Sequence, residues 1–476
     1  MLKQPETALS LAARIRSGEL SALEATEQTL SRIDAVNPKL NAIIWRDDTD
    51  ARARAARADD VLANHRGEPD TLPPFLGVPI PIKELNDVAG WPNTMGSLGV
   101  SEGPRPRNDL VVDLLEKAGF VLLGRSNAPE MGPMSVTENL RYGITRNPWN
   151  LEHSPGGSSG GAAASVASGM FSVAHASDGG GSIRVPSSSC GLVGLKPSRG
   201  RVPARVMSWE ASVTDGVVTR TVADTAAVLD VIGVRDDNLY YPSAPEPLRP
   251  FLSEVGADGP RLRIGLMLEA PTGLPVDVEC IEAAVKTAEI LEKLGHQVFP
   301  ASPTFYSREA IEGFLEVVIN ASLYIYPWED QSKAEQFIQF RMQRALDFHA
   351  GQYTMAAARL HEETPAVRAQ WGRDFDVLLT PTMATLPPLA GAITHEANTD
   401  WHGGRETEIR MISFTAVSNI SGLPAISLPI HMSKSGLPVG AQLVGGPFGE
   451  GSLLRLAAEI ETAVGWLDRV APVHAE

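Results

Sequence analysis

Strand-like and helix-like segments alternate along most of this 476-residue chain, and the alternation constrains its fold more than any other feature. An apolar run at 77–83 is followed by a helical pattern at 109–118 and a strand-like run at 120–124. Residues 217–232 have the pattern of a strand that leads into a helix, and residues 261–267 that of another strand. Alternation of this kind predicts an α/β fold with a mostly parallel sheet covered by helices.

The two ends of the chain add further expected elements. Apolar residues recur at helical spacing over 7–17 and 21–36, and Ser21 with Glu24 forms a capping-box pattern. A loop at 234–260, rich in proline and acidic residues, is the best candidate for an internal boundary. The remaining expected elements are helices over 47–64 and 276–294, a strand near 296–299, helical segments through about 370, strands at 375–379 and 425–429, and a closing helix at 452–464.

Composition and charge exclude several classes of protein. The chain is 43% hydrophobic and 21% charged, which is typical of a globular protein. Its net charge of −16 disfavours nucleic acid and anionic membranes as partners. The first residues lack a signal-peptide pattern, and no stretch approaches the ~18 apolar residues of a membrane span, so we expect a cytoplasmic protein. Cys190 and Cys280 are too few and too far apart to predict a disulfide framework or a metal site.

A glycine-serine motif at 156–161 places Ser158 at the centre of a Gly-x-Ser-x-Gly pattern. This pattern also occurs in the nucleophile elbow of α/β-hydrolases, where the serine follows a strand. Here residues 147–155 read as a loop, which argues against an elbow. A flexible linker or a phosphate-binding loop is the other interpretation, although the motif lacks the Gly-Lys-Ser/Thr ending of a P-loop.

A second glycine-rich loop, Gly179, Gly180 and Gly181, directly precedes Ser182. Successive glycines allow backbone N–H groups to converge on one point, as an oxyanion hole requires. Ser182 is therefore the better candidate nucleophile, although a simple tight turn remains an alternative. Lys83, flanked by Val78, Ile80 and Ile82, is the candidate base, because a desolvated lysine has a lowered pKa and can accept a proton from a hydroxyl.

Together these elements resemble the amidase signature family. The matching segments are GVPIPIK at 77–83, PGGSSGG at 155–161, SDGGGSIR at 177–184, CGLVGLKPSRGR at 190–201 and NISGLPAIS at 419–427. The intervals from Lys83 to Ser158 and from Ser158 to Ser182 also match those of the family. The resemblance is strong over roughly 70–235 and 375–445, and thin over 236–370.

The resemblance implies a fold, a domain organisation and a catalytic triad. It implies the amidase signature fold, in which helices cover both faces of a central mixed β-sheet. The chain is then a single domain, 1–476, with a helical part at 1–65, a catalytic core at 70–235, a variable substrate-side region at 236–375 and a C-terminal core segment at 376–476. By the resemblance, Ser182 attacks, Ser158 follows a cis peptide bond and relays the proton, and Lys83 is the base, without a metal or other cofactor.

Some residues depart from this scheme or offer another one. Many family members have a threonine where this chain has Gly179, which suggests a looser loop. His153 and His175 could form a Ser-His-Asp site of an α/β-hydrolase esterase with Asp178, but we expect both histidines to be structural. Arg184 is expected to anchor the loop as a structural cation, and Asp178 to accept hydrogen bonds from it.

The resemblance also guides the expected substrate. The glutamine-hydrolysing amidotransferase subunits of the family have an acidic residue shortly before the late motif. This chain has MISFT at 411–415 there, which argues against that role and leaves it as the alternative function. The segment TRNPWN at 145–150 resembles the corresponding segment of the family members that hydrolyse cyclic nylon oligomers. We therefore expect a small-molecule substrate: an uncharged, partly apolar linear or cyclic amide or anilide, with carbamates (urethanes) and esters as further substrates. Met131 and Gly132 are candidate substrate-binding residues, and a homodimer is possible.

Overall fold

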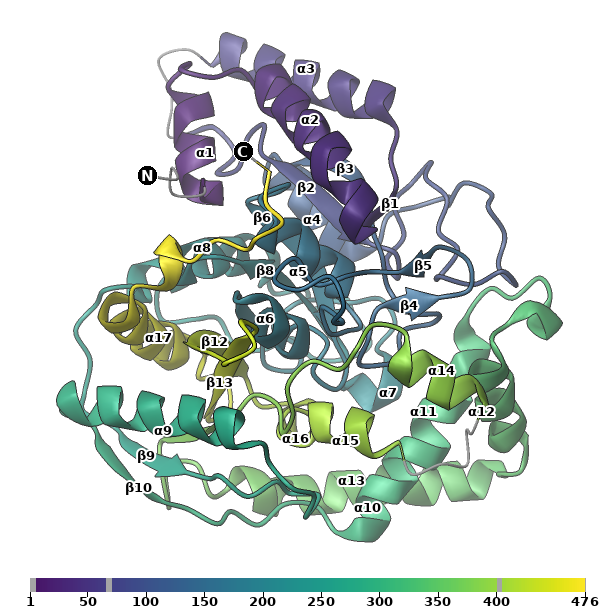
Figure 1. The fold of residues 1–476 in the computed structure, drawn as a ribbon, viewed down its shortest axis with the longest axis vertical. Coiled ribbons are helices and arrows are strands. Elements are labelled where there is room, and N and C mark those ends of the chain that lie inside the picture. Colours follow the sequence, from purple (N-terminus) through teal and green to yellow (C-terminus); the bar gives the residue numbers. More distant parts are fainter. Residues whose placement is uncertain (1–5, 66–70, 400–404, 476) are drawn as a thin grey trace.

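The computed structural model describes residues 6–65, 71–399 and 405–475. Among these residues, eight strands form a central sheet in the order β10-β9-β11-β13-β12-β7-β8-β6, with helices on both of its faces (Figure 1). The strands are β6 (Val173–Asp178), β7 (Val193–Lys196), β8 (Thr214–Thr219), β9 (Arg263–Leu266), β10 (Gln297–Pro300), β11 (Val377–Pro381), β12 (Ala425–Met432) and β13 (Pro438–Gly445). The expected α/β fold with a central mixed sheet is confirmed.

The sheet is mixed, so the mostly parallel sheet that the alternation predicts is wrong. β9 pairs in parallel with β10 and β11, whereas the other five neighbouring pairs of described strands in this sheet are antiparallel. The reason is clear at β6 and β7. Helix α6 (Arg184–Cys190) connects them and they run in the same direction, but β8 lies between them and is antiparallel to both. Alternation predicts the helical connection and not which strands pair.

The two faces of the central sheet carry different helices. Helices α5 (Gly160–Ala167) and α6 pack on one face, and α8 (Val222–Ile232), α9 (Val278–Lys293) and α17 (Glu450–Val464) pack on the other. Along β13, Ala441 and Leu443 belong to the apolar core beneath α17, whereas Gln442 between them accepts a hydrogen bond from Arg184 of α6. The period of two along the strand thus separates apolar packing from a polar network on the side of α6.

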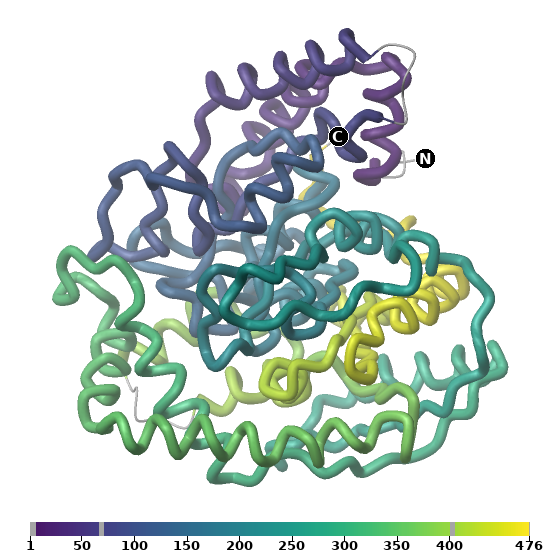
Figure 2. Tube along the Cα trace, turned by 180° about the vertical axis from the view of Figure 1, so that it is seen from behind, coloured from purple at the N-terminus to yellow at the C-terminus, as the bar shows by residue number. Residues whose placement is uncertain are grey.

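A smaller sheet and the N-terminal helices lie beside the central sheet. Strands β1 (Ile43–Trp45), β3 (Val121–Ser126) and β2 (Pro79–Lys83) pair in that order, with β2 parallel to β3. Helices α1 (Ala8–Arg16), α2 (Ala22–Leu40) and α3 (Asp48–Asn64) gather at one end of the molecule, where the C-terminus also lies (Figure 2). Ser21 and Glu24 form the predicted capping box, and α2 runs beyond the predicted residue 36 to the left-handed Asn41.

The remaining elements are mostly helices. The predicted helices at 109–118, 276–294 and 452–464 are confirmed as α4, α9 and α17. None of the helices in the described part of the chain is long and apolar enough to cross a membrane. Helix α4 spans Leu110–Lys117, and β4 (Glu138–Asn139) and β5 (Gly143–Ile144) form a small hairpin. The other helices are α7 (Ser208–Ala211), η2 (Phe251–Glu254), α10 (Arg308–Glu312), the π-helix η3 (Gly313–Val318), α11 (Ile319–Ser322), η4 (Leu323–Ile325), η5 (Gln331–Lys333), α12 (Gln336–Leu346), α13 (Ala350–Arg368), α14 (Ala392–Thr399), α15 (Glu406–Ile412), α16 (Ala416–Ser421) and η6 (Trp466–Asp468).

Two strand ends place the motifs of the sequence next to each other. Lys83 is the last residue of β2, and Asp178 is the last residue of β6, directly before the second glycine loop. Strand β2 packs against β6, although the two strands belong to different sheets. The apolar lysine segment and the glycine loop therefore meet at one place in the fold.

Candidate active site

Lys83 is fully buried at the end of β2, and its amine faces two serines. Its Nζ donates to Ser158 Oγ at 2.9 Å, to Ser177 Oγ at 3.0 Å and to the Ser177 carbonyl oxygen at 3.2 Å. Burial lowers the pKa of Lys83 to about 7, against the opposing effect of the Asp178 and Asp215 carboxylates. A substantial fraction of this amine is therefore neutral near pH 7.

Ser158 lies in the first glycine-serine motif, just before α5, and is almost completely buried. The Gly157–Ser158 peptide bond is cis, as the family resemblance implies. No side chain fits at position 157, because a Cβ there would lie 2.4 Å from the carbonyl oxygen of Val136. Residues 147–155 contain no strand, which agrees with the argument against a nucleophile elbow at this motif.

Ser182 lies in a different context, a turn that connects a strand to a helix. It follows β6 and the glycines 179–181, and α6 begins two residues later. The carboxylate of Asp178 shapes this turn by accepting hydrogen bonds from the N–H groups of Gly181 at 2.7 Å and Ile183 at 3.1 Å. At Gly181, φ is +138°, and a Cβ would lie 2.4 Å from Thr415 Oγ1, so a glycine is needed.

The Ser182 loop is tied to the C-terminal segment through Arg184. This fully buried guanidinium binds both oxygens of Asp178 at 3.0 Å, and also donates to Asn419 Oδ1 at 2.6 Å and Gln442 Oε1 at 2.7 Å. Thr415 completes the connection by donating to the Gly180 carbonyl oxygen at 2.7 Å. Burial raises the pKa of Asp178, but Arg184, together with Lys196 and Asn419, outweighs it and holds the pKa of this carboxyl well below its ordinary value. Arg184 and Asp178 thus have the structural roles that the sequence predicts.

The three glycines of the loop differ in what their N–H groups bind. The Gly181 N–H donates to Asp178. Within the described residues, the N–H groups of Gly179, Gly180 and Ser182 have no hydrogen-bond acceptor in the protein. These groups are the ones that remain available to an anion bound at the loop.

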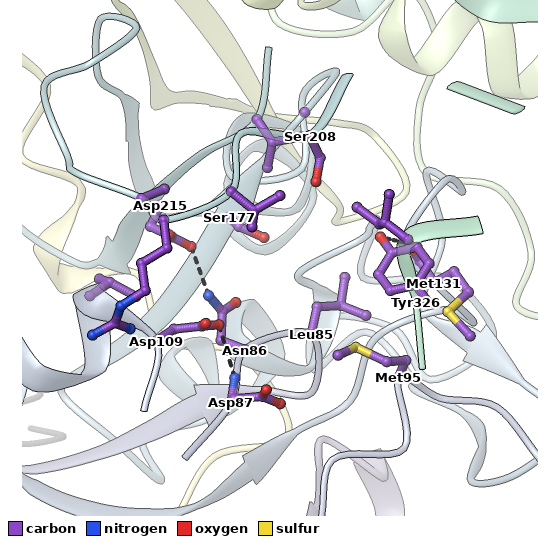
Figure 3. A pocket seen from close by; sticks show the side chains of 18 of the residues that line it. Leu85, Asn86, Asp87, Met95, Asp109, Met131, Ser177, Ser208, Asp215 and Tyr326 are labelled. Carbon is purple, nitrogen blue, oxygen red and sulfur yellow. Dashed lines mark hydrogen bonds between the residues drawn. The ribbon is translucent and has the colours of Figure 1, made fainter. Parts of the chain in front are cut away.

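A pocket of about 400 Å³ opens over these residues, a volume suited to a small molecule. Ser158, Ser177, Gly179 and Ser182 line its floor, so Lys83 reaches the pocket through Ser158. Figure 3 shows two different sides of this pocket. Asn86, Asp109 and Asp215 lie on one side, and Met95, Met131 and Tyr326 on the other.

Met131 and Gly132, the candidate substrate-binding residues, line this pocket. Both have left-handed backbones, with φ values of +55° and +87°, and the Met131 carbonyl oxygen accepts a hydrogen bond from Tyr326 Oη at 3.1 Å. A Cβ added at Gly132 would lie 2.6 Å from Leu85 Cδ1 and 3.8 Å from Ser158 Oγ. A side chain at position 132 would therefore clash with Leu85 and touch Ser158.

The two histidines near the motifs do not contact either serine hydroxyl by a hydrogen bond. His153 Nδ1 pairs with the Pro387 carbonyl oxygen at 2.8 Å, and His175 Nε2 lies 3.3 Å from Asp215 Oδ1. Asp178, the third member of the alternative Ser-His-Asp site, binds Arg184 instead of a histidine. The structure thus places Ser158 and Ser182 at one pocket, with Lys83 hydrogen-bonded to Ser158, and binds both histidines to other partners.

Several residues of the site were not singled out from the sequence. Ser177 contacts the Lys83 amine, and Thr415 and Asn419 hold the glycine loop. Ser177 could have been recognised as the neighbour of Asp178 in a matching segment. Trp209 and Tyr326, which also line the pocket, belong to segments without a distinctive pattern.

Cys190 and Cys280 are buried free thiols, and burial raises the pKa of both, to about 12 for Cys280. Neither lines the pocket. Across 6–65, 71–399 and 405–475, no group of three or more histidine, cysteine, aspartate and glutamate side chains is arranged to hold a metal ion.

Comparison with known proteins identifies the family. The amidase family profile matches residues 24–454. The chain is 36% identical to a 6-aminohexanoate-cyclic-dimer hydrolase of Pseudomonas sp. (strain NK87), over 98% of this chain and 96% of that protein. A structure of 6-aminohexanoate cyclic dimer hydrolase complexed with substrate aligns with a TM-score of 0.90 and 32% identity, covering 99% of this chain and 100% of that one. A bacterial aryl acylamidase of the amidase signature family aligns with a TM-score of 0.86 and 26% identity, covering 97% of each chain. The chain therefore belongs to the amidase family, as its motifs predict, and is a hydrolase that acts on amide carbon–nitrogen bonds.

Proposed function

We propose that this amidase hydrolyses uncharged, partly apolar amides through an acyl-enzyme on Ser182, with Ser158 as the proton relay and Lys83 as the base. The observation that carries the proposal is the hydrogen bond of 2.9 Å between the buried Lys83 amine and Ser158, which lines the same pocket as Ser182. A neutral lysine has two N–H donors and one lone pair. The oxygens of Ser177 can accept from both donors, which leaves the lone pair for the Ser158 proton.

The proposed reaction proceeds in two halves. In the first, Ser182 Oγ attacks the carbonyl carbon while its proton passes to Ser158 Oγ and the Ser158 proton passes to Lys83 Nζ. The tetrahedral intermediate collapses, the carbon–nitrogen bond breaks, and the proton returns along the same path to the leaving nitrogen. In the second half, water attacks the Ser182 ester, loses its proton to the relay, and releases the acid and the free serine.

The oxyanion of each tetrahedral intermediate needs N–H donors. We assign this role to the glycine loop, with Gly179 and Gly180 as donors together with Ser182, because these N–H groups have no other acceptor in the described chain. Gly181 is not a donor of this proposed oxyanion hole, although the sequence pattern groups it with Gly179 and Gly180. Its N–H is bound to Asp178, so it fixes the turn instead of donating to the substrate.

The substrate class follows from the pocket and from the relatives. Leu85, Met95, Met131 and Tyr326 offer an apolar wall next to the serines, which suits uncharged substrates with apolar parts. The relatives named above act on a cyclic amide dimer and on aryl acylamides by their names. Linear or cyclic amides and anilides are therefore the first substrates to test. Carbamates and esters follow, since their carbonyl groups can form the same acyl-enzyme with a different leaving group.

The experiment combines a substrate panel with identification of the nucleophile. The purified protein and its Ser182→Ala variant are assayed with cyclic amides, anilides, carbamates and esters, and intact mass is measured after reaction with a serine-directed covalent inhibitor. We expect hydrolysis and a single label on Ser182, both lost in the variant. A label on another serine, or turnover by Ser182→Ala at the wild-type rate, would refute the proposal. A parallel glutamine assay tests the amidotransferase alternative, which predicts release of ammonia.

A further inference from the structure

Gly179 and Trp209 touch each other at the wall of the pocket. A Cβ added at Gly179 would lie 2.7 Å from Cζ3 and 2.9 Å from Cε3 of Trp209, and 3.1 Å from Val213 Cγ2. A Cβ essentially never lies within 3.0 Å of a heavy atom from a non-neighbouring residue in folded proteins, so a side chain at position 179 would displace the indole. Both residues line the pocket that contains Ser182. The absence of a side chain at 179 therefore gives the indole its place against the serine loop.

The backbone that carries Trp209 adopts an unusual conformation. Trp209, Glu210 and Ala211 all have left-handed backbones, with φ values of +56°, +51° and +58°, which are unfavourable for residues other than glycine. Such a conformation persists only where the surroundings hold it.

Contacts of the two residues that follow Trp209 hold this turn. The Glu210 carboxylate accepts a hydrogen bond from Tyr353 Oη of α13 at 2.5 Å, and its other oxygen lies 3.5 Å from His361 of the same helix. The Ala211 carbonyl oxygen accepts from Arg199 at 2.9 Å. Helix α13 thus holds Glu210, and Arg199 holds Ala211, directly after Trp209.

Trp209 lines a pocket that has an apolar side, with Met95, Met131 and Tyr326, and a polar side, with Asn86, Asp109 and Asp215. Trp209 packs against an apolar cluster that includes Phe314 and Phe414, whereas Met95 and Met131 belong to a second apolar cluster at the other side of the pocket. A molecule bound at Ser182 therefore meets an aromatic side chain next to the loop and flexible methionine side chains on the apolar side of the pocket.

We infer that Trp209, in the space left by Gly179, is a specificity-determining residue that favours amides with a planar or aromatic group beside the scissile bond. The inference rests on the proposed function and names the substrate feature that this site would select. A planar group can stack on the indole, whereas a short aliphatic amide gains little from it.

A double-mutant cycle tests this pairing. The variants are Gly179→Ala, Trp209→Ala and their combination, and the measured quantity is kcat/KM for an anilide and for an aliphatic amide with the same acyl group. We expect Trp209→Ala to lower the anilide-to-aliphatic ratio of kcat/KM by about tenfold. Gly179→Ala should lower the ratio similarly by displacing the indole, and should add little further loss in the Trp209→Ala background. Trp209→Phe should keep part of the preference, which separates stacking from loss of structure.

Gly180→Ala is the matched control on the same loop. A Cβ at Gly180 meets no atom within 4 Å, and the substitution keeps the N–H group. Its effect should be the same whether or not Trp209 is present. Additive effects of Gly179→Ala and Trp209→Ala, or an unchanged substrate ratio in Trp209→Ala, would overturn the inference.

Failure of this inference is distinguishable from failure of the proposed function. The rate at which Ser182 is labelled by an aryl and by an alkyl serine-directed inhibitor is measured in every variant. If Ser182 is not labelled in the wild-type protein, the proposed nucleophile is wrong. If Ser182 is labelled but the aryl-to-alkyl rate ratio does not depend on Trp209, only the specificity inference is wrong.

Discussion

Lys83 and Lys196 are two buried lysines at the ends of apolar strands, β2 and β7, and they differ in what surrounds their amines. Burial is the main cause that lowers the pKa of each to about 7. Lys83 Nζ contacts Ser158 and Ser177, which line the pocket. Lys196 Nζ instead donates to the Pro197 carbonyl oxygen at 2.7 Å, and Lys196 does not line the pocket. A lowered pKa supplies a neutral amine at both positions, and in the proposed mechanism only the hydroxyl relay to the substrate makes the Lys83 amine a catalytic base.

The charges near the two lysines also differ. Asp178 and Asp215 raise the pKa of Lys83 against the effect of burial. Around Lys196, Arg184 lowers the pKa further, while Asp178 raises it. Lys196 is thus part of the charge network behind the Ser182 loop, and its neutral state limits the positive charge collected there.

The strongest test of this comparison removes each amine in turn. We expect Lys83→Ala to lower kcat by roughly a thousandfold, because the proton of Ser158 loses its acceptor. Lys196→Met should retain most of the wild-type kcat. Steady-state kinetics and the rate of Ser182 labelling measure both effects, and thermal melting checks that each variant is folded. Equal losses of activity in two folded variants would contradict the distinction between the lysines.

Replacing the serine neighbours of Lys83 tests the relay itself. Ser158→Ala should lower kcat by roughly a hundredfold or more, since it interrupts the proton path between Ser182 and the amine. Ser177→Ala should cost less, because the Ser177 carbonyl oxygen still accepts from Lys83 at 3.2 Å. If single-turnover acylation is slowed more by Ser177→Ala than by Ser158→Ala, the proton path has been assigned to the wrong serine.

The pH dependence of kcat/KM sharpens the comparison further. Because the neutral amine is the active form, kcat/KM should rise with pH through about 7, the pKa of Lys83, and level off above it. Asp215 stabilises the charged amine, so Asp215→Asn should lower this pKa and move the rise toward lower pH. Lys196→Met should leave the apparent pKa near that of the wild type. If the apparent pKa of kcat/KM shifts in Lys196→Met and not in Asp215→Asn, the observed ionisation belongs to Lys196.

The smallest expected effect is on stability. The pKa of Lys196 is about 7 in the folded protein and near the ordinary value of 10.5 in the unfolded chain, so the unfolded state binds the proton more tightly. This difference lowers the free energy of unfolding. The reduction is full below pH 7, declines between pH 7 and 10.5, and is absent above pH 10.5. Lys196→Met removes it and should raise the melting temperature by about 2 °C or more at pH 7, with a smaller gain at pH 10. A gain that does not change between these pH values would come from packing and not from the charge.

Much of the fold could be predicted from local patterns, because strands such as β2 and β3 and helices such as α9 and α17 have clear periodicity. Strand pairing could not, because β8 lies between β6 and β7 without any local signal of its place. Strand β13 was missed, since proline and glycine residues interrupt its apolar pattern over Pro438–Gly445.

The same contrast holds at the site. Lys83, Ser158 and Ser182 are recognisable by their spacing, and the structure brings them to one pocket. The position of Trp209 is not recognisable, because three successive left-handed residues other than glycine have no sequence signature. The expected looseness at Gly179 is not what the structure suggests either, since the indole of Trp209 and Val213 fill the space beside this glycine.

The ties between the Ser182 loop and the C-terminal segment have a consequence for biosynthesis. Arg184 binds Thr415, Asn419 and Gln442, which lie 231, 235 and 258 residues later in the chain. On a ribosome, Ser182 is therefore synthesised long before the residues that shape its turn. A nascent chain that ends before Thr415 contains every residue of the proposed triad but lacks these three partners of Arg184, so we expect hydrolytic activity only after residues 415–442 have been synthesised.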